Sequence, residues 1–155
     1  MKKEKKGYRI TGLVVPFGLS PNANGHIYNK DSFAKAFGEY EKLVKEGKAF
    51  GCLDKKDDNP FYSVSVCVPD VSHRVTDMRI TNNGITMSAE ILDTPKGDIV
   101  RNIIDSGNDI YIAPRMVGNV DGKGNVTVQN ITSFDIVMKS AFDVKPMSVK
   151  KKDKQ

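Results

Sequence analysis

The sequence of 155 residues contains no tryptophan, two histidines and two cysteines, and it has no long apolar run. A membrane-spanning helix needs about 18 or more apolar residues in succession, and a secretory signal needs a shorter apolar core. Neither pattern occurs, so we expect a soluble protein in a reducing compartment, without a membrane partner. His26 and His73 do not stand at metal-ligand spacing with Cys52 and Cys67, so neither a metal nor a cofactor is predicted.

The positive charge is concentrated at the two ends of the sequence. Residues 1–7 hold four lysines and one glutamate, a net charge of +3, and residues 145–155 hold five lysines and one aspartate, a net charge of +4. The whole chain carries +5, so residues 8–144 carry −2. Lysine arms on a near-neutral body would bind nucleic acid nonspecifically and with strong salt dependence. We expect a basic arm at 1–7 and a basic tail at 141–155, either solvated or docked on an acidic partner.

The remaining residues, 8–140, have the size of one ordinary domain with a single core. Asn-Gly at 83–84 supplies the φ angles of a tight turn between strands at 73–81 and 85–92. Thr94 and Pro95 start a short helix that Gly107 ends, and aromatic residues at helical spacing predict another helix over 32–46. Mostly antiparallel strands with two interposed helices predict an α+β domain or a small barrel with helices outside. The other expected strands are 8–16, 49–54, 62–68, 110–117 and 126–140.

Six stretches, in this order, resemble the prohead maturation proteases of tailed bacteriophages, whose fold is similar to that of herpesvirus assemblin. They are NANGHIYNKDSFAKAF (22–37), FGCLD (50–54), VSHRVTDMRI (71–80), ILDTPKGDIVRNIIDSG (91–107), IYIAPRMVG (110–118) and ITSFDIV (131–137). In the first, Asn24, Gly25, Ile27 and Tyr28 match the family's element before the first helix. The resemblance implies a small, mostly antiparallel β-barrel with two or more flanking helices, and a serine protease that trims scaffold and capsid precursors.

The resemblance places the catalytic residues at positions where this sequence departs from the family. The family's catalytic histidine follows a strand matched by residues 51–53, and here Lys55 or its neighbours occupy that place. The family's nucleophilic serine precedes an arginine, and here Ala113 and Pro114 precede Arg115. Alanine has no hydroxyl, and lysine, with an ordinary pKa of about 10.4, is protonated and donates instead of accepting a proton. We therefore predict no catalytic residues, with Lys55, Ala113, Pro114 and Arg115 as vestigial positions.

The residues around these positions have structural interpretations. Pro114 cannot donate a ladder hydrogen bond, so we expect it at a strand edge or bulge, tolerated because no substrate backbone must react there. Arg115 is expected to pair with a carboxylate such as Asp135 or to hydrogen-bond a loop, although in an active relative it could help to stabilise an oxyanion. Ser72 and His73 are neighbours on a strand, so their side chains are expected on opposite faces, unable to form a dyad.

Chemistry at displaced residues stays open. A cysteine nucleophile could be served by a histidine, although burial is the commoner fate of a strand cysteine. A serine could use a lysine base, as in other proteases. The combinations are Cys52 or Cys67 with His73, and Lys55 with Ser106 or Ser133.

The sequence favours a non-enzymatic structural protein of the phage virion. Such an auxiliary or minor capsid protein would bind the major capsid protein or other virion proteins and be assembled in the cytoplasm of the bacterial host. The alternatives are a divergent or inactivated prohead maturation serine protease and a nonspecific nucleic-acid-binding accessory protein. Binding to acidic partner surfaces is assigned to the terminal lysines. These are Lys2, Lys3, Lys5, Lys6, Lys150, Lys151, Lys152 and Lys154.

Overall fold

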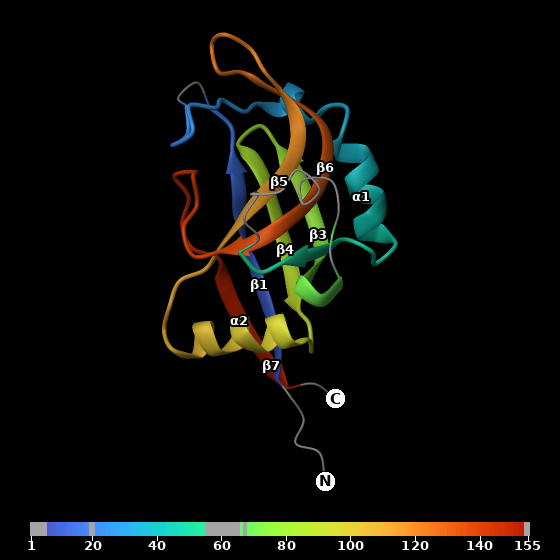
Figure 1. Ribbon diagram of the computed structural model, residues 1–155, viewed down its shortest axis with the longest axis vertical. Coiled ribbons are helices and arrows are strands. Elements are labelled where there is room, and N and C mark those ends of the chain that lie inside the picture. The colour runs from blue at the N-terminus through green and yellow to red at the C-terminus, as the bar shows by residue number, and fades with distance from the viewer. Residues whose placement is uncertain (1–5, 19–20, 55–65, 67, 154–155) are drawn as a thin grey trace.

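The computed structural model describes residues 6–18, 21–54, 66 and 68–153. Within these residues, no helix is both long enough and apolar enough to cross a membrane. Figure 1 shows the elements in chain order. They are β1 (Lys6–Pro16), the 3-10 turn η1 (Lys30–Phe33), α1 (Phe37–Lys45), β2 (Phe50–Cys52), the 3-10 turn η3 (Val68–Asp70), β3 (Val71–Thr81), β4 (Gly84–Ile91), α2 (Pro95–Asp105), β5 (Tyr111–Val120), β6 (Val126–Val137) and β7 (Ser148–Asp153).

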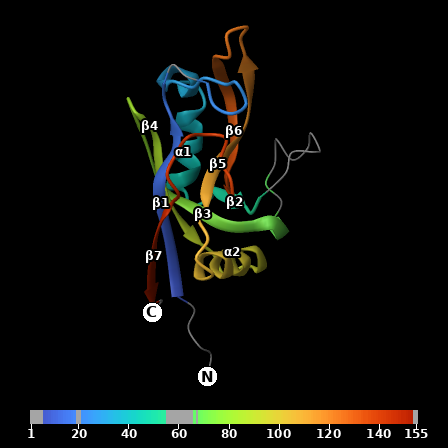
Figure 2. The same ribbon diagram turned by 90° about the vertical axis from the view of Figure 1, so that its left-hand side faces the viewer.

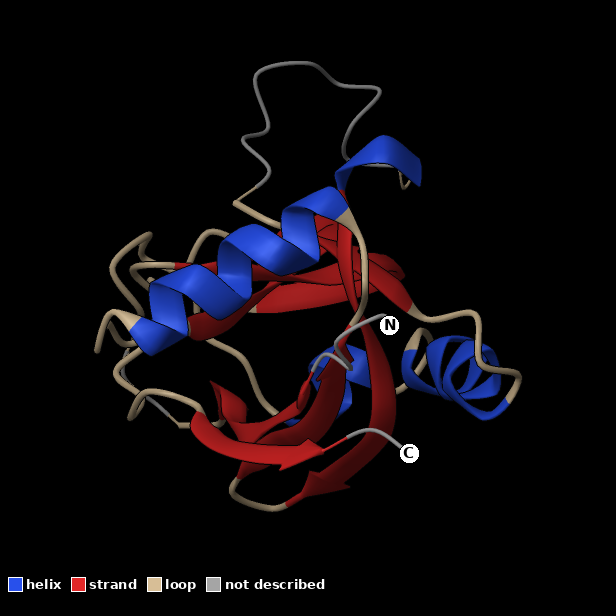
Figure 3. Cartoon of the chain, turned by 90° about the horizontal axis from the view of Figure 1, so that it is seen from below, coloured by secondary structure: helices blue, strands red, loops and turns tan. Residues whose placement is uncertain are grey.

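The strands form two antiparallel sheets, which confirms the α+β class. One sheet has the order β2-β3-β4-β1-β7, and β5 pairs with β6 in a separate two-stranded ribbon. Seen from the end at which α2 lies, the strands form two layers (Figure 3). The closed barrel expected from the sequence is not present among the described residues. Instead, a single parallel bridge between Leu53 and Ile136 links the end of β2 to β6, so the layers touch without a continuous ladder.

The β3–β4 hairpin is as predicted. Asn82 and Asn83 make its turn, and Gly84 follows at φ 146°. A Cβ at position 84 would collide with the carbonyl oxygen of Val15 on β1. Only glycine can adopt that φ and also approach the neighbouring backbone so closely. Gly84 therefore shapes both the hairpin turn and the contact between the hairpin and β1.

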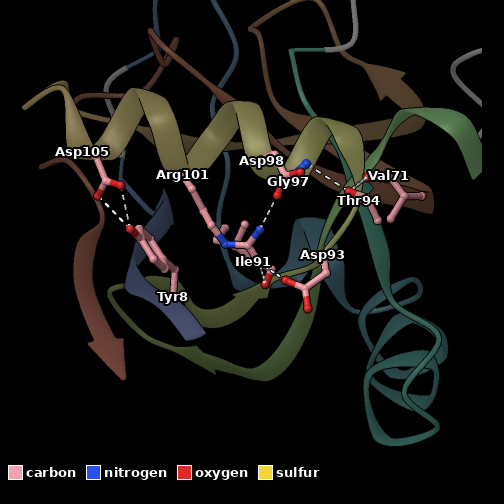
Figure 4. Close-up of polar contacts among 9 residues, drawn as sticks. All are labelled: Tyr8, Val71, Ile91, Asp93, Thr94, Gly97, Asp98, Arg101 and Asp105. Atoms are coloured by element: carbon pink, nitrogen blue, oxygen red, sulfur yellow. Dashed lines mark hydrogen bonds and ion pairs between the residues drawn. The ribbon is translucent and has the colours of Figure 1, made fainter. Parts of the chain in front are cut away.

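Helix α2 is also as predicted, and its first turn is tied to the hairpin. The Thr94 hydroxyl accepts from the Gly97 N–H at 3.0 Å and donates to the Val71 carbonyl at 2.6 Å (Figure 4). The buried Arg101 side chain reaches back along the chain to two carboxylates, Asp93 at 2.6 Å and Asp98 at 2.7 Å. A capped N-terminus and a paired arginine together hold the helix across the ends of β3 and β4.

The helix predicted over 32–46 is divided in the structure. The Asn29 side chain accepts from the Ser32 N–H while the Ser32 hydroxyl accepts from the Asn29 N–H, and this capping box closes a separate 3-10 turn. Helix α1 starts only at Phe37. The predicted apolar stripe is confirmed in part, since Phe33, Tyr40 and Val44 are buried.

The lysine-rich C-terminal segment is a strand where the sequence suggested a tail. Strand β7 pairs antiparallel with β1, whose first residue is Lys6, so part of each predicted basic end lies within the sheet. The pairing follows from alternation, because Val149 is half-buried while Lys150 and Lys152 are exposed. The Lys151 ammonium, on the inner side, lies 2.7 Å from Asp105. Lys2, Lys3, Lys5 and Lys154 lie outside the described residues.

Met147 immediately precedes β7, and replacing it by alanine should destabilise the protein by about 2 to 5 kcal/mol. Its side chain is 6% exposed and its sulfur packs against Gly12, so truncation would leave a cavity. The matched control, Lys150→Ala, removes an exposed side chain and should change stability by less than about 0.5 kcal/mol. Urea unfolding followed by circular dichroism measures both. Small, equal effects would contradict a packed C-terminal strand.

Candidate functional site

The β5–β6 register brings two of the predicted vestigial positions, Ala113 and Arg115, onto one face of the ribbon, while Pro114 lies opposite Phe134 on the other face. Ala113 lies opposite Asp135, and Arg115 lies opposite Ser133. Residues two apart on a strand share a face, so all four side chains are on the same side. The opposite face carries Ile112, Phe134 and Ile136, which are fully buried in the core.

A buried ion pair lies at the centre of this face. The Arg115 Nε donates to Asp135 Oδ2 at 2.9 Å, and the two side chains are 6% and 5% exposed. The other carboxylate oxygen, Oδ1, accepts from the Ser133 hydroxyl at 2.8 Å and from the Cys52 N–H at 3.0 Å. The expected pairing of Arg115 with Asp135 is thus confirmed, and each oxygen of the carboxylate has a donor, as a buried charge requires.

The end of β2 runs beside this carboxylate. Cys52 donates its N–H to Asp135, and the Asp54 N–H donates to the Ile136 carbonyl at 2.6 Å. The next residue, Lys55, at the place of the family's histidine, lies outside the described residues, as does Cys67. The predictions made for those two side chains are therefore untested.

His73 on β3 is completely buried behind the ribbon. Its Nε2 lies 2.6 Å from the Phe134 carbonyl, which can only accept, so Nε2 carries the proton. The Nδ1 then accepts from the Ser72 hydroxyl at 2.7 Å. The expectation that Ser72 and His73 cannot meet is wrong. Val71, Ser72 and His73 are all buried where β3 leaves a 3-10 turn, so simple alternation does not hold there.

The Ser72–His73 pair is structural, despite its resemblance to a catalytic dyad. Neither residue has any exposed surface, so no substrate can reach the hydroxyl. A Cβ on Gly51 would collide with the His73 ring and the Phe134 carbonyl, which shows how tightly β2, β3 and β6 meet here. Burial lowers the pKa of His73, while the Phe134 carbonyl and the Asp135 charge oppose that shift. The imidazole links three strands as a neutral group.

A pocket of about 390 Å³ opens in front of Ala113. The loop that contains His26 and Tyr28 forms one wall, because Ile27 makes a parallel bridge with Asn125 at the end of the hairpin. Three of the stretches quoted above, 22–37, 110–118 and 131–137, therefore meet in one cavity. Burial raises the pKa of Tyr28, so its phenol stays protonated. The lining residues are Asn24, His26, Tyr28, Ala113, Pro114, Arg115, Met116, Gly118, Val120, Val126, Val128, Asp135 and Val137.

The other candidates do not assemble in this pocket. The Ser106 hydroxyl, at the end of α2, donates to the Asn102 carbonyl at 2.7 Å. The Ser133 hydroxyl is buried and committed to Asp135. The buried Cys52 sulfur accepts from the Arg115 guanidinium, with an N–S distance of 3.8 Å. Across the described part of the chain, no three His, Cys, Asp or Glu side chains gather as metal ligands would.

Removing the charge of Asp135 tests the ion pair. Asp135→Asn should lower the free energy of unfolding by about 3 to 5 kcal/mol, because the buried Arg115 loses its carboxylate. The matched control is Asp77→Asn, whose side chain is 64% exposed and pairs with Arg9 at 2.6 Å. It should cost at most about 1 kcal/mol. If both substitutions lower the free energy of unfolding equally in denaturant, the buried ion pair stabilises the protein no more than the exposed one.

The buried His73 predicts a loss of stability in mild acid. Its folded-state pKa lies below the ordinary 6.5, so the unfolded chain binds a proton that the folded chain does not. Stability from this group is complete above pH 6.5 and falls as the pH drops towards the folded value, by up to about 1.4 kcal/mol per unit. His73→Asn should flatten that slope in unfolding measured from pH 7.5 to 5. An NMR titration of His73 with an ordinary midpoint would contradict the assignment.

Comparison with known proteins identifies the fold. No protein-family model matches the sequence, and no curated protein sequence matches it. Among solved structures, the chain is similar to the capsid assembly protease gp21 of bacteriophage T4, with a TM-score of 0.73 and 22% sequence identity. The match covers 90% of this chain and 87% of that one. The chain therefore has a phage prohead-protease-like fold, as the six stretches predicted.

Proposed function

We propose that the chain is a non-enzymatic capsid protein of a tailed phage, built on the fold of a prohead protease. One observation carries the proposal. The pocket in front of Ala113 has no serine, threonine, cysteine or lysine among its described lining residues, so none of them offers an ordinary acyl-transfer nucleophile. A methyl group stands where the resemblance places the hydroxyl.

The surrounding groups favour a structural role. Arg115 is held by Asp135, and Asp135 in turn is occupied by Ser133 and the Cys52 N–H. An arginine already paired in the interior is poorly placed to stabilise an oxyanion in the pocket. An active acyl-transfer site would instead leave donors directed at the substrate. Here the same region is used to hold β2, β5 and β6 together.

The fold similarity suggests where such a protein acts. The neighbour is a capsid assembly protease, so a related fold without turnover fits a component that stays with the capsid. We propose the major capsid protein or another virion protein as the partner, in the virion, after assembly in the host cytoplasm. Exposed terminal lysines such as Lys150 and Lys152 provide electrostatic attraction, with nonspecific nucleic-acid contact as a secondary effect.

The proposal is tested by co-expressing the chain with the major capsid protein of the phage proposed to encode it. Intact-mass spectrometry should find both proteins uncleaved and associated, and a fluorophosphonate probe should label no serine of the chain. Ala113→Ser should leave the result unchanged, because the carboxylate opposite it, Asp135, is already held by Arg115, Ser133 and the Cys52 N–H, and His26 comes from the loop that forms another wall of the pocket.

Cleavage of the capsid protein would contradict the proposal. Three variants would then be tested separately: Cys52→Ala, Cys67→Ala and Lys55→Ala. The substitution that abolishes the cleavage would identify the displaced catalytic group. A matched Lys35→Ala variant, which alters an exposed lysine before α1, controls for loss of charge.

A further inference from the structure

The outer face of the five-stranded sheet is uncovered and cationic. In Figure 2, β4, β1 and β7 run along one side of the molecule, and the β5–β6 ribbon and α2 lie on the other. Alternation turns the core residues of these strands inward and a second set outward. The outward charged side chains are Arg9 on β1, Arg74, Asp77 and Arg79 on β3, Glu90 on β4, and Lys150 and Lys152 on β7.

The two carboxylates of this face are already used. Asp77 pairs with Arg9 at 2.6 Å, and Glu90 pairs with Arg74 at 3.2 Å. The remaining cations, Arg79, Lys150 and Lys152, are exposed, and no described carboxylate forms an ion pair with any of them. The face therefore carries three uncompensated positive charges, although residues 8–144 as a whole are slightly negative.

The register fixes how far apart these charges lie. Lys150 is level with Arg9, whereas Arg79 is level with Leu13, four residues further along β1. Strands β7 and β3 are three steps apart in the sheet. At about 4.8 Å per strand and 3.4 Å per residue, the two Cα atoms are about 20 Å apart. A single small anion cannot span that distance, but about six residues of extended polypeptide can.

The surface between these charges suits a polypeptide. It holds a shallow hollow of about 360 Å³ lined in part by Thr11, Thr86 and Ser88. The Thr11 and Ser88 hydroxyls hydrogen-bond each other at 2.9 Å, and the partly exposed Thr86 hydroxyl can bond a backbone amide or a carboxylate. Among the described residues, no aromatic side chain points outward on β1, β3, β4 or β7. The exposed Phe50 lies on the edge strand β2, beyond β3 and outside the span between Arg79 and Lys150, so no ring within that span can stack on a base.

We propose that the outer face of the five-stranded sheet is a docking site for an acidic, extended protein segment of about six residues, held at its ends by Lys150 with Lys152 and by Arg79. The inference goes beyond the proposed function, because it holds whether or not the chain cleaves a substrate. It assigns the partner contact to a folded surface, and it adds Arg79, a residue far from the terminal lysines in sequence.

The test uses the full chain and a fluorescein-labelled hexaglutamate peptide in a fluorescence-anisotropy titration at low salt. The unsubstituted protein should bind, with affinity that falls as salt is added. Arg79→Glu/Lys150→Glu should weaken binding about tenfold or more, because two attractive contacts become repulsive. The control with the same charge change, Lys35→Glu/Lys42→Glu in and before α1, should weaken it less than threefold.

If charge reversal disturbs folding, the double variant Arg79→Gln/Lys150→Gln, which removes the two charges without reversing them, takes its place. It should still weaken binding several-fold. The proposal is overturned if the unsubstituted protein does not bind hexaglutamate, or if the face and control variants lose affinity equally. It is also overturned if a six-nucleotide oligo-dT binds as tightly as the peptide, since the face would then recognise phosphate.

Discussion

The buried ion pair between Arg115 and Asp135 is the interaction on which the two layers of strands depend. Its carboxylate accepts from a side chain on β5, a side chain on β6 and a backbone N–H on β2, so one charged group ties three strands. Beside it, His73 joins β3 to β6 through the Phe134 carbonyl. Among the described residues the two sheets are joined by one isolated bridge, so these polar contacts, together with the core around Phe134, set how the layers meet.

The same constraint is compatible with the proposed absence of a nucleophile from this fold. Removing one member of a buried ion pair leaves an uncompensated charge, which costs several kcal/mol. An alanine at position 113 removes only a hydroxyl at a half-buried site, so the fold does not depend on it. Arg115 and Asp135 can therefore stay in place for stability while the chemistry at position 113 is absent. An intact arginine next to the pocket is, on this account, no sign of catalysis.

Local signals in the sequence were enough to predict the β3–β4 hairpin and α2, because Asn83-Gly84 and Thr94-Pro95 act within a few residues. The resemblance correctly predicted the fold. Strand β7 was missed, because its single half-buried Val149 stands among lysines whose charge suggested a solvated tail. The Ser72–His73 hydrogen bond was missed because alternation fails after a 3-10 turn. The pocket joins residues about ninety positions apart in the sequence, which no local pattern can specify.

The most direct test of the proposed role is the amount of this chain in purified mature particles of its proposed phage, measured by gel densitometry and mass spectrometry. A non-enzymatic capsid component should be present at full length and at a fixed ratio to the major capsid protein. A chain that is abundant in immature heads but absent or fragmented in mature ones would contradict the account, because that is how a maturation protease would be expected to behave.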